Sequence, residues 1–405
     1  MILKNKRIIL GVTGSIAAYK AADLASKLAQ AGALVDTVLT QAAERFISPL
    51  TFQSVTGRPA FTDGDLWNGQ SHVLHQQLAA GAGLLIIAPL TAHTLAKLTQ
   101  GLGNDLLSLV ALSADCPLLI APAMDGGMCK HPAVQENLRL LRERGAVIVG
   151  PEHGHLASGL EAVGRMSEPS EILGQARYLL SRSGPLKNRV AVITAGGTQE
   201  PVDPVRVLAN RSSGKQGFAL AQAALDAGAQ VILIAGPTAL STPIGAQRKN
   251  VHTAEEMAHA VLHACHEADA LIMTAAVADF KPSQPARQKI KKDNGLAAID
   301  LEPTPDILKL IERQRRQTGF PKIVIGFAAE SECLIENAMA KLKNKNLSLI
   351  AANNVSDENS GFGADVNQVT LIGADGAVEP LPRLPKTEIA QKIIQRLLGL
   401  LANSS

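Results

Sequence analysis

The segment 189–217 combines residue types that can bind and activate a charged substrate. An apolar run from Val190 to Ala195 leads directly into two glycines. This pattern is typical of a central parallel strand whose carboxyl end faces a phosphate-sized ligand. A polar, proline-containing stretch then precedes Ser212-Ser213-Gly214-Lys215 and a helix predicted over 216–227. Such an enlarged crossover lies at the sheet edge where parallel sheets bind ligands.

Charged residues also follow two later strands of the second half. A strand predicted over 270–275 continues into Ala276-Val277-Ala278-Asp279, and a strand over 324–329 carries an acid at its end. Lys341 and Lys345 are four residues apart, so they share one face of a helix. A third lysine group surrounds Lys289, and its charge alone favours a solvated surface. Convergence of the three lysine positions would instead indicate a triphosphate with its magnesium.

The first half contains an earlier strand, glycine turn and helix, over 8–12, 11–15 and 16–31. Gly14 lets backbone N–H groups approach an anion at the helix N-terminus, and Ser15 adds a hydroxyl. The turn is not GxGxxG, and Thr40 rather than an acid follows the second strand, which suits a phosphate better than an adenosine ribose. A tight turn without a ligand is the alternative.

Two further strand ends of the first half carry small residues and methionines. The strand 84–88 is followed by Pro89 and Thr91, which suit a cofactor that bridges two βα loops. The strand 118–121 precedes Met124 and Met128, although a methionine pair four residues apart is more often packing. The glycine-rich stretch 154–166 is predicted to be a mobile flap.

These patterns predict an α/β protein with two Rossmann-like parallel-sheet domains in tandem. We expect a first domain over 1–183, a linker over 184–189 that contains Gly184 and Pro185, and a second domain over 190–405.

The composition limits the classes of partner. A net charge of +3 and 3% aromatic residues argue against nucleic acid. No apolar run reaches the roughly 18 residues that a membrane span needs. The four cysteines show neither paired metal spacing nor a disulfide framework, and basic residues before the first strand do not resemble a secretory signal. We therefore expect a soluble cytoplasmic protein.

Taken together, the motifs resemble those of the bifunctional proteins of coenzyme A biosynthesis. In that family a phosphopantothenoylcysteine decarboxylase, related to homo-oligomeric flavin-containing cysteine decarboxylases, is fused to a phosphopantothenate–cysteine ligase. The resemblance runs from about residue 6 to 395 and rests on Gly11-Val12-Thr13-Gly14-Ser15, Ala88-Pro89-Leu90-Thr91, Pro122-Ala123-Met124, Gly164-Arg165-Met166, Gly196-Gly197-Thr198, Asn210-Arg211-Ser212-Ser213-Gly214-Lys215, Ala275-Ala276-Val277-Ala278-Asp279, Lys289-Ile290-Lys291-Lys292 and Gly326-Phe327-Ala328-Ala329-Glu330.

For the first half the resemblance implies an FMN-dependent decarboxylase. FMN supplies the electron sink that an unactivated cysteine carboxylate needs in order to leave as carbon dioxide. The catalytic histidine would be His72, with His75 as its rival. The family positions that would hold FMN are Gly14, Ser15, Thr40, Pro89 and Thr91, and those at the substrate are Met124, Asp125 and Met128.

Two positions depart from the commonest family pattern. Asp125 stands where asparagine is usual, so a carboxylate would face the substrate carboxylate. Ser158 stands at the flap position of the cysteine that often donates the final proton, and a hydroxyl is a far weaker acid than a thiol. A working site with another proton donor and a slowed decarboxylase are both compatible with these residues.

For the second half the resemblance implies a ligase that activates phosphopantothenate with CTP and magnesium before cysteine displaces CMP. Lys289 would stabilise charge on the phosphate during transfer, and Asn210 would hydrogen-bond the acyl intermediate. Arg206 is a candidate for the substrate phosphate. The CTP-binding positions would be Ala275, Asp279, Lys289, Pro305, Asp306, Ile307, Leu308, Phe327, Lys341 and Lys345.

The resemblance also implies a homo-oligomer, with trimers of the flavoprotein half joined by dimers of the ligase half, up to a dodecamer. Two other classes stay open from the residues. An NAD-dependent oxidoreductase is disfavoured because the GxGxxG turn and the ribose-binding acid are missing. A flavoprotein half that binds without catalysing, as a regulator, gains support from Asp125 and Ser158.

Overall fold

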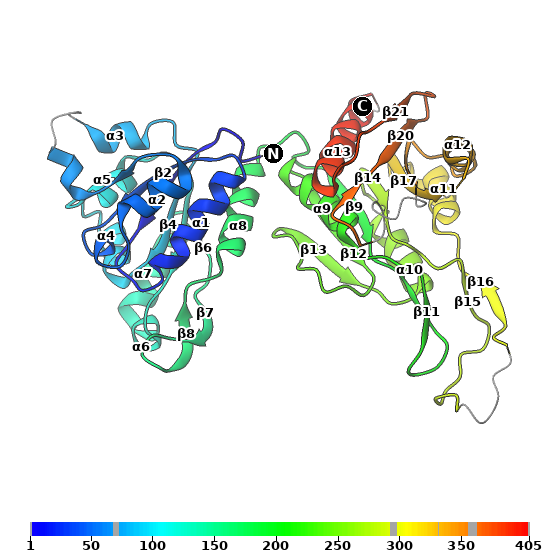
Figure 1. Ribbon diagram of the computed structural model, residues 1–405, viewed down its shortest axis with the longest axis horizontal. Helices are drawn as coiled ribbons and strands as arrows, with labels where there is room; N and C mark the ends of the chain where they lie inside the picture. The colour runs from blue at the N-terminus through cyan, green and yellow to red at the C-terminus, as the bar shows by residue number, and fades with distance from the viewer. Residues whose placement is uncertain (1, 68–72, 292–297, 331, 355–362, 404–405) are drawn as a thin grey trace. The chain divides into compact units, whose positions relative to one another are not determined.

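A computed structural model of the chain describes residues 2–67, 73–291, 298–330, 332–354 and 363–403. The chain divides into two compact units, Met1–Ser181 and Arg182–Ser405. Each unit is built on its own largely parallel sheet, so the predicted class of two α/β domains in tandem is confirmed (Figure 1). In the described part of the chain, no helix is both long and apolar enough to span a membrane.

The sheet of the first unit is parallel throughout its described strands. The order is β3 (Ala60–Phe61), β2 (Leu34–Leu39), β1 (Arg7–Val12), β4 (Leu84–Leu90), β5 (Leu118–Pro122) and β6 (Val147–Ile148). The chain therefore runs outward from β1 in one direction and then from β4 in the other. The point between β1 and β4 is a topological switch point, where sheets of this kind bind ligands.

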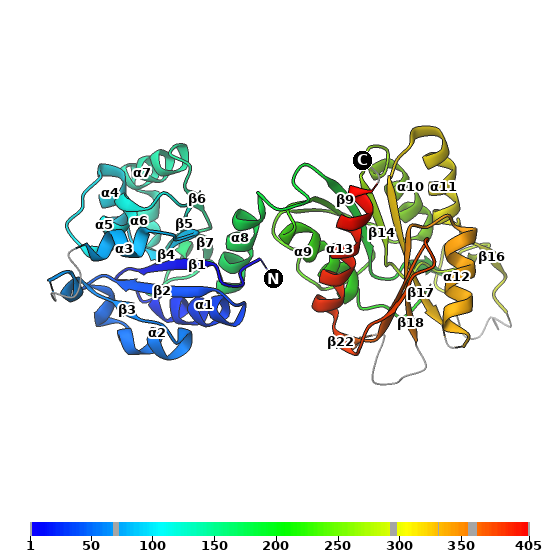
Figure 2. The ribbon, with the colours of Figure 1, turned by 90° about the horizontal axis from the view of Figure 1, so that it is seen from above.

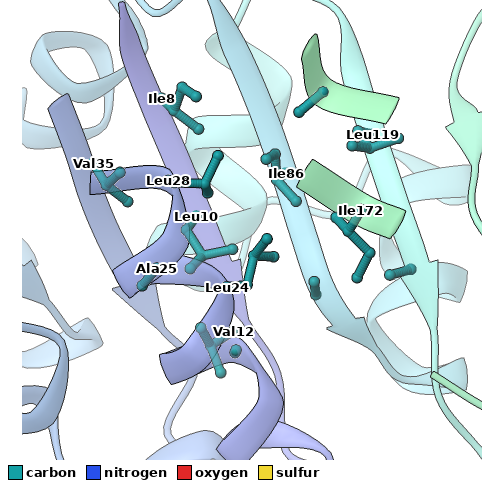
Figure 3. Close-up of a cluster of buried hydrophobic side chains, with 14 of the residues drawn as sticks. Ile8, Leu10, Val12, Leu24, Ala25, Leu28, Val35, Ile86, Leu119 and Ile172 are labelled. Carbon is teal, nitrogen blue, oxygen red and sulfur yellow. The ribbon is translucent and has the colours of Figure 1, made fainter. Parts of the chain in front are cut away.

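Helices cover both faces of this sheet (Figure 2). Strand β1 alternates between them: Ile8 and Leu10 pack toward α1 and α8 (Figure 3), and Ile9 packs toward the opposite face. The helices on the first face are α1 (Ala18–Gln30), α2 (Pro49–Thr56) and α8 (Pro169–Ser181). Those on the second are α3 (Leu74–Ala79), α4 (Ala92–Gln100), α5 (Leu106–Ser113) and α7 (Pro132–Glu143). The predicted helix over 16–31 is thus two residues shorter at its start and one at its end.

A short helix and a hairpin complete the first unit. Helix α6 (Gly126–Lys130) follows β5, and the hairpin joins β7 (Glu152–His155) to β8 (Glu161–Arg165). Two short 3-10 turns, η1 (Ala43–Arg45) and η2 (Asp63–Trp67), connect the outer elements. The stretch predicted to be a glycine-rich flap forms this hairpin, and its turn carries Ser158.

The second unit has a larger, mixed sheet. Its order is β13 (Ala246–Asn250), β12 (Gln230–Ala235), β9 (Val190–Ala195), β14 (Ala270–Met273), β17 (Ile323–Glu330), β18 (Leu349–Asn354), β20 (Val369–Gly373) and β21 (Val378–Pro380). The first six strands are parallel, and β20 and β21 add antiparallel to the edge. The predicted strand over 190–195 is confirmed at both ends.

Helices again lie on both faces of the second sheet (Figure 2). Helices α9 (Lys215–Asp226) and α13 (Lys386–Ala402) pack against each other on one face. Helices α10 (Ala254–Ala264), α11 (Ile307–Thr318) and α12 (Leu334–Asn344) form the core of the other face with Val192 and Ile234. Three small pairs stand outside the sheet: β10 (Gln199–Pro201) with β11 (Val207–Ala209), β15 (Phe280–Pro282) with β16 (Leu301–Pro303), and β19 (Val366–Asn367) with β22 (Leu384–Pro385).

One carboxylate joins the starts of three central strands in this unit. Asp269, which precedes β14, accepts hydrogen bonds from the backbone N–H of Val190 (3.0 Å), from Arg189 (2.8 Å) and from Lys322 (3.1 Å). Burial tends to raise the pKa of Asp269, but these three donors outweigh it and hold the pKa below its usual range. The ionised carboxylate therefore ties β9, β14 and β17 together at the edge opposite their carboxyl ends.

We predict that Asp269→Asn lowers the free energy of unfolding of the second unit by about 1–3 kcal/mol, because it removes a charge that three donors stabilise. The native pKa lies below the unfolded value of about 3.9, so this contribution is present above that pH and is lost as the pH falls through the native pKa. Denaturant unfolding at pH 7 and at pH 3 measures the free energy of unfolding of the variant and of the native protein. The control variant is Asp300→Asn, which changes an exposed aspartate. An equal loss of unfolding free energy at the two pH values would contradict the role given to the Asp269 carboxylate.

Candidate active sites

A buried threonine organises the switch point of the first unit. Strands β1 and β4 pair as far as Gly11 and Ile87 and then separate. The Thr13 hydroxyl donates to the carbonyl oxygen of Pro89 (2.7 Å) and accepts from the backbone N–H of Thr91 (3.0 Å). It thereby supplies the partners that these backbone groups would otherwise lack. The turn after β1 and the turn after β4 are consequently held together.

A cavity of about 300 Å³ lies beside this switch point. It is formed by the turn between β1 and α1, the turn between β5 and α6, and the β7–β8 hairpin. Gly164 of β8 approaches Met124 so closely that a Cβ at this glycine would stand 2.2 Å from the Met124 carbonyl oxygen. The backbone N–H of Met124 also donates to the carbonyl of Gly164 (3.0 Å). Only glycine permits the hairpin to seat against the β5–α6 turn in this way.

The structure brings part of the predicted flavin site together. Ser15, Met124, Asp125 and Ser158 line the cavity. The others predicted for the cofactor lie at the neighbouring strand ends, outside the cavity lining: Gly14, Thr40, Pro89 and Thr91. Met128 is half exposed on α6, and His75 lies on α3, also outside the lining. His72 falls outside the described residues.

The two residues that depart from the family pattern contact each other. The Ser158 hydroxyl donates to one carboxylate oxygen of Asp125 (2.6 Å), and the other oxygen accepts from the backbone N–H of Gly127 (3.0 Å). The hydrogen bond from Ser158, followed by that from Gly127, lowers the pKa of Asp125. Asp125 is therefore a capping carboxylate at the start of α6 that stays ionised at neutral pH.

Three charged or titratable residues of this cavity received no role from the sequence. Lys20 is almost wholly buried and donates to the Met166 carbonyl (3.0 Å) and to Glu168 (2.8 Å), while Arg165 also pairs with Glu168. His155, at the end of β7, has an exposed side chain that lines the cavity. The sequence did carry a signal for Lys20, because a lysine at a position on the apolar face of a predicted helix must find a polar partner inside the protein.

The first cavity carries polar groups and a helix start that suit a flavin phosphate. Helix α1 begins at Ala18 without a side-chain cap, and residues at its start line the cavity, where the positive end of the helix favours an anion. The backbone N–H groups of Ala18 and Lys20 already donate to the carbonyls of Ser15 (2.9 Å) and Ala17 (3.0 Å). Ser15 adds a hydroxyl at the same end, and Lys20 adds a positive charge one turn further along. These residues fit the phosphate of FMN.

A second threonine repeats the arrangement in the other unit. Strands β9 and β14 pair as far as Thr194 and Met273. The fully buried Thr194 hydroxyl then accepts from the backbone N–H groups of Thr274 (3.0 Å) and Ala275 (3.1 Å). The loop 274–279, which carries several predicted site residues, therefore starts in a defined direction at the carboxyl edge of the sheet.

A cavity of about 910 Å³ opens at this edge. Most of the predicted CTP and substrate positions line it, although they come from distant parts of the sequence: Asn210, Ala275, Asp279, Pro305, Asp306, Ile307, Leu308, Phe327, Lys341 and Lys345. The Asn210 side chain donates to the Val277 carbonyl (2.9 Å). This contact places the amide at the mouth of the loop after β14.

Two lysines at the end of α12 reach the cavity beside the start of α11: Lys341 in the last turn and Lys345 at the C-cap. Lys341 donates to the Phe327 carbonyl (3.0 Å), and Lys345 pairs closely with Asp306. Asp306 also caps α11 by accepting from the backbone N–H of Lys309 (3.2 Å). Burial tends to raise the pKa of Asp306, but the hydrogen bond from Lys345 and that from Lys309 outweigh it, so the pKa is lowered. Lys341 thus lies in the last turn of α12, and Lys345 is the C-cap residue that follows this helix.

Lys289 and Arg206 lie outside the lining of this cavity. Arg206 pairs with the inaccessible carboxylate of Asp203 and donates to the Ile290 carbonyl (2.9 Å), while the Ile290 backbone N–H donates to Asp203 (3.2 Å). These bonds hold the segment that carries exposed Lys289 against the turn between β10 and β11. Lys289 is therefore not among the residues that line this cavity, and its part in binding the triphosphate stays a prediction.

The same cavity contains polar residues that had received no role. Ser212, Ser213 and Lys215 line it at the start of α9, and Lys386 lines it at the start of α13. The sequence showed the Ser-Ser-Gly-Lys stretch as the start of a helix, but no pattern near position 386 indicated a ligand-binding site. Among the described residues there is no group of three or more His, Cys, Asp or Glu side chains that could hold a metal ion.

Comparisons with known proteins match both units. Residues 2–179 match the family model "Flavoprotein", and residues 186–400 match "DNA/pantothenate metabolism flavoprotein C-terminal domain". The chain is 42% identical over 402 residues to the coenzyme A biosynthesis bifunctional protein CoaBC of Bacillus subtilis, covering 98% of each chain. It is 40% identical over 412 residues to the protein of that name from Mycobacterium tuberculosis, covering 99% of this chain and 98% of the relative.

Solved structures resemble the two halves separately. The crystal structure of the C-terminal domain of a CoaBC protein is 38% identical and covers 55% of this chain and 100% of that chain, with a TM-score of 0.47. A mutant PPC decarboxylase complexed with pantothenoylaminoethenethiol is 32% identical and covers 43% of this chain and 97% of that chain, with a TM-score of 0.40. From the full-length relatives and the family models, the chain belongs to the family of bifunctional coenzyme A biosynthesis proteins.

Proposed function

We propose that the second unit ligates cysteine to 4'-phosphopantothenate with CTP, and that the first unit decarboxylates the product to 4'-phosphopantetheine. The observation that carries the ligase assignment is the second cavity, which gathers Asn210, Asp279, Asp306, Phe327, Lys341 and Lys345 from five separate segments. A site with two lysines, two carboxylates and an amide at one sheet edge suits a nucleoside triphosphate and an acid to be activated.

The ligase reaction divides into two balanced steps. A carboxylate oxygen of phosphopantothenate forms a bond to the α-phosphorus of CTP, and the bond from that phosphorus to the leaving pyrophosphate breaks. The amine of cysteine then bonds to the acyl carbon, loses a proton and displaces CMP. Activation is needed because a carboxylate is a poor electrophile.

Several side chains have defined parts in this proposal. Asn210 would hydrogen-bond the acyl intermediate, and Lys341 and Lys345 would bind CTP with the α11 start that Asp306 caps. Magnesium would be held mainly by the phosphates, as it commonly is. Lys289 and Arg206 lie outside the cavity, so their roles require a second copy or a different position of their loop.

For the first unit we propose FMN at the switch point, held by Ser15 and the uncapped start of α1, with Gly14, Thr40, Pro89 and Thr91 around it. When bound, FMN supplies the electron sink for loss of carbon dioxide. The net reaction replaces a carboxylate by hydrogen and so consumes one proton. Because the Ser158 hydroxyl already donates to Asp125, we infer that His155 is a third candidate proton donor beside His72 and Ser158.

We further propose a cytoplasmic homo-oligomer of flavoprotein trimers joined by ligase dimers. Ile16 and Tyr19 line the first cavity yet are 60% and 64% exposed, which favours a second copy covering them. In the second unit, Val205, Phe280 and Leu301 expose apolar side chains on the hairpins outside the sheet. All four cysteines are free thiols, as in a reducing compartment.

A second candidate is an active ligase with an impaired or regulatory flavoprotein half. The contact between Ser158 and Asp125 favours it, because neither group is then a ready proton donor.

We expect purified protein supplied with phosphopantothenate, cysteine, CTP and magnesium to accumulate 4'-phosphopantetheine, which mass spectrometry follows. Chelation of magnesium should stop formation of phosphopantothenoylcysteine, because the triphosphate then lacks its counter-ion. A yellow protein that halts at phosphopantothenoylcysteine would favour the regulatory alternative. A protein that makes no phosphopantothenoylcysteine would refute the ligase assignment.

We also predict that Asp125→Asn lowers the KM for phosphopantothenoylcysteine about three- to tenfold, because it removes repulsion between two carboxylates near the solvent. The asparagine oxygen can still cap α6 by accepting from the Gly127 N–H, while the side-chain NH2 takes the place of the second oxygen and can donate to the Ser158 hydroxyl. Raising the salt concentration should narrow the difference between the two proteins, since exposed charges are screened. Steady-state kinetics of carbon dioxide release measures both effects, and a higher KM in the variant would show that Asp125 does not face the substrate carboxylate.

A further inference from the structure

Two hairpins outside the second sheet begin or end at the lining of the ligase cavity and extend away from the sheet (Figure 1). The β15–β16 pair follows Asp279 and ends at Pro303, and both of these residues line the cavity. The β10–β11 pair is followed by Asn210, which also lines it. Lys289 belongs to the segment after β15, so its place depends on the contacts that hold this segment.

A carboxylate at the turn of the β10–β11 hairpin makes two separate sets of contacts. The Asp203 side chain is inaccessible to solvent. Its Oδ1 atom accepts from the backbone N–H groups of Val205 (2.8 Å) and Arg206 (2.9 Å), which lie within the turn. Its Oδ2 atom accepts from Nε of Arg206 (2.9 Å) and from the backbone N–H of Ile290 (3.2 Å). One oxygen therefore folds the turn, and the other holds the residue next to Lys289.

Two further hydrogen bonds hold the same segment against the turn. A terminal nitrogen of Arg206 donates to the Ile290 carbonyl (2.9 Å), and the backbone N–H of Ala286 donates to the Val202 carbonyl (2.9 Å). Both backbone groups of Ile290 thus have their partners in the turn. The segment 286–290 belongs to no strand or helix, and ordering it costs conformational entropy. These hydrogen bonds offset that cost and define where the segment lies.

The charge of Asp203 makes this anchor strong. The hydrogen bond from Arg206 holds the pKa of Asp203 well below its usual range, and the N–H groups of Val205 and Ile290 add to the effect, although burial opposes it. The carboxylate is therefore ionised at neutral pH, and hydrogen bonds to an ionised acceptor are stronger than neutral ones. Release of Ile290 would leave a solvent-inaccessible charge short of a donor, which is costly.

We propose that Asp203 is a positioning residue of the ligase, because its Oδ2 atom fixes the segment that carries Lys289 in its working position. This inference rests on the proposed ligase function and on the phosphate contact expected of Lys289. Asp203 does not line the cavity and acts through the Ile290 backbone. The exposed Lys289 side chain starts from an anchored backbone, which favours its action on a second copy over movement of its loop.

The anchor should affect the transfer step more than the binding of CTP. Lys289 is expected to stabilise charge that develops on the phosphate during transfer. A segment without its anchor samples many positions, so the ammonium is less often placed for that charge. An interaction made mainly in the transition state changes kcat, whereas one made equally with bound CTP changes KM.

The first measurement is hydrogen exchange of the full-length protein and its Asp203→Asn variant, followed residue by residue. The asparagine oxygen can still accept from Val205 and Arg206, since asparagine suits such turns, but its NH2 group then faces the donors of Arg206 and Ile290. The Ile290 amide should exchange about ten- to a hundredfold faster, because a bond to a charged acceptor is lost. The amides of Val205 and Arg206 should keep their protection.

The second measurement follows the first ligase step alone, as incorporation of labelled pyrophosphate into CTP with phosphopantothenate present and cysteine absent. The kcat of Asp203→Asn should fall about tenfold, and its KM for CTP should change by less than about twofold. Asp300→Asn is the matched control, because it removes an exposed carboxylate between β15 and β16 without changing the anchor. This control should match the native protein in both measurements.

Faster hydrogen exchange at Ile290 together with a lower kcat and an unchanged Tm supports the proposal. Native hydrogen exchange at Ile290 overturns it. Faster exchange with a native or higher kcat also overturns it, because the working position of Lys289 would then not depend on Asp203. Loss of protection at Val205 and Arg206 with a lower Tm overturns it as well, since Asp203 would only fold the turn. A native protein that incorporates no pyrophosphate would refute the proposed ligase function, whereas hydrogen exchange would still show whether Asp203 holds the segment.

Discussion

Both active-site edges depend on how two neighbouring parallel strands separate. Where the strands part, backbone N–H and C=O groups lose their partners in the sheet, and a buried group without a partner is costly. The Thr13 hydroxyl replaces those partners between β1 and β4, and the Thr194 hydroxyl does so between β9 and β14. Each threonine thereby sets the direction of loops beside a cavity, so the two sites are shaped before any ligand enters.

The charges around each cavity are largely paired within the protein, and the pairs indicate what each site can bind. In the first unit Glu168 engages both Lys20 and Arg165, and Asp125 is committed to α6 and Ser158. In the second unit Lys345 is matched by Asp306. Lys386 is buried at the start of α13, where its ammonium donates to the Ala364 carbonyl with Lys215 and Asp365 close by.

The structure also changes the meaning of the two departures from the family pattern. From the residues alone, Asp125 and Ser158 were two separate changes, one affecting the substrate carboxylate and one the proton donor. In the folded protein they form a single hydrogen-bonded pair between the turn of the β7–β8 hairpin and the start of α6. A serine opposite an ionised aspartate is therefore a contact that joins the hairpin to α6, as well as a candidate catalytic group.

The sequence by itself determined the two tandem α/β domains and strand β9 at both its ends, because apolar runs and helix starts are local patterns. The residues that line the second cavity were expected from the resemblance to a known family, not from such patterns. The spacing of Lys341 and Lys345 brought them to one end of a helix, where Lys341 lies in the last turn of α12 and Lys345 is its C-cap residue. The sequence did not determine that Lys289 is held away from the cavity or that Lys386 enters it. Those outcomes depend on contacts between distant segments, Arg206 with Ile290 in one case and α9 with α13 in the other. Only the tertiary structure decides such contacts, since no local periodicity encodes which loops meet at a sheet edge.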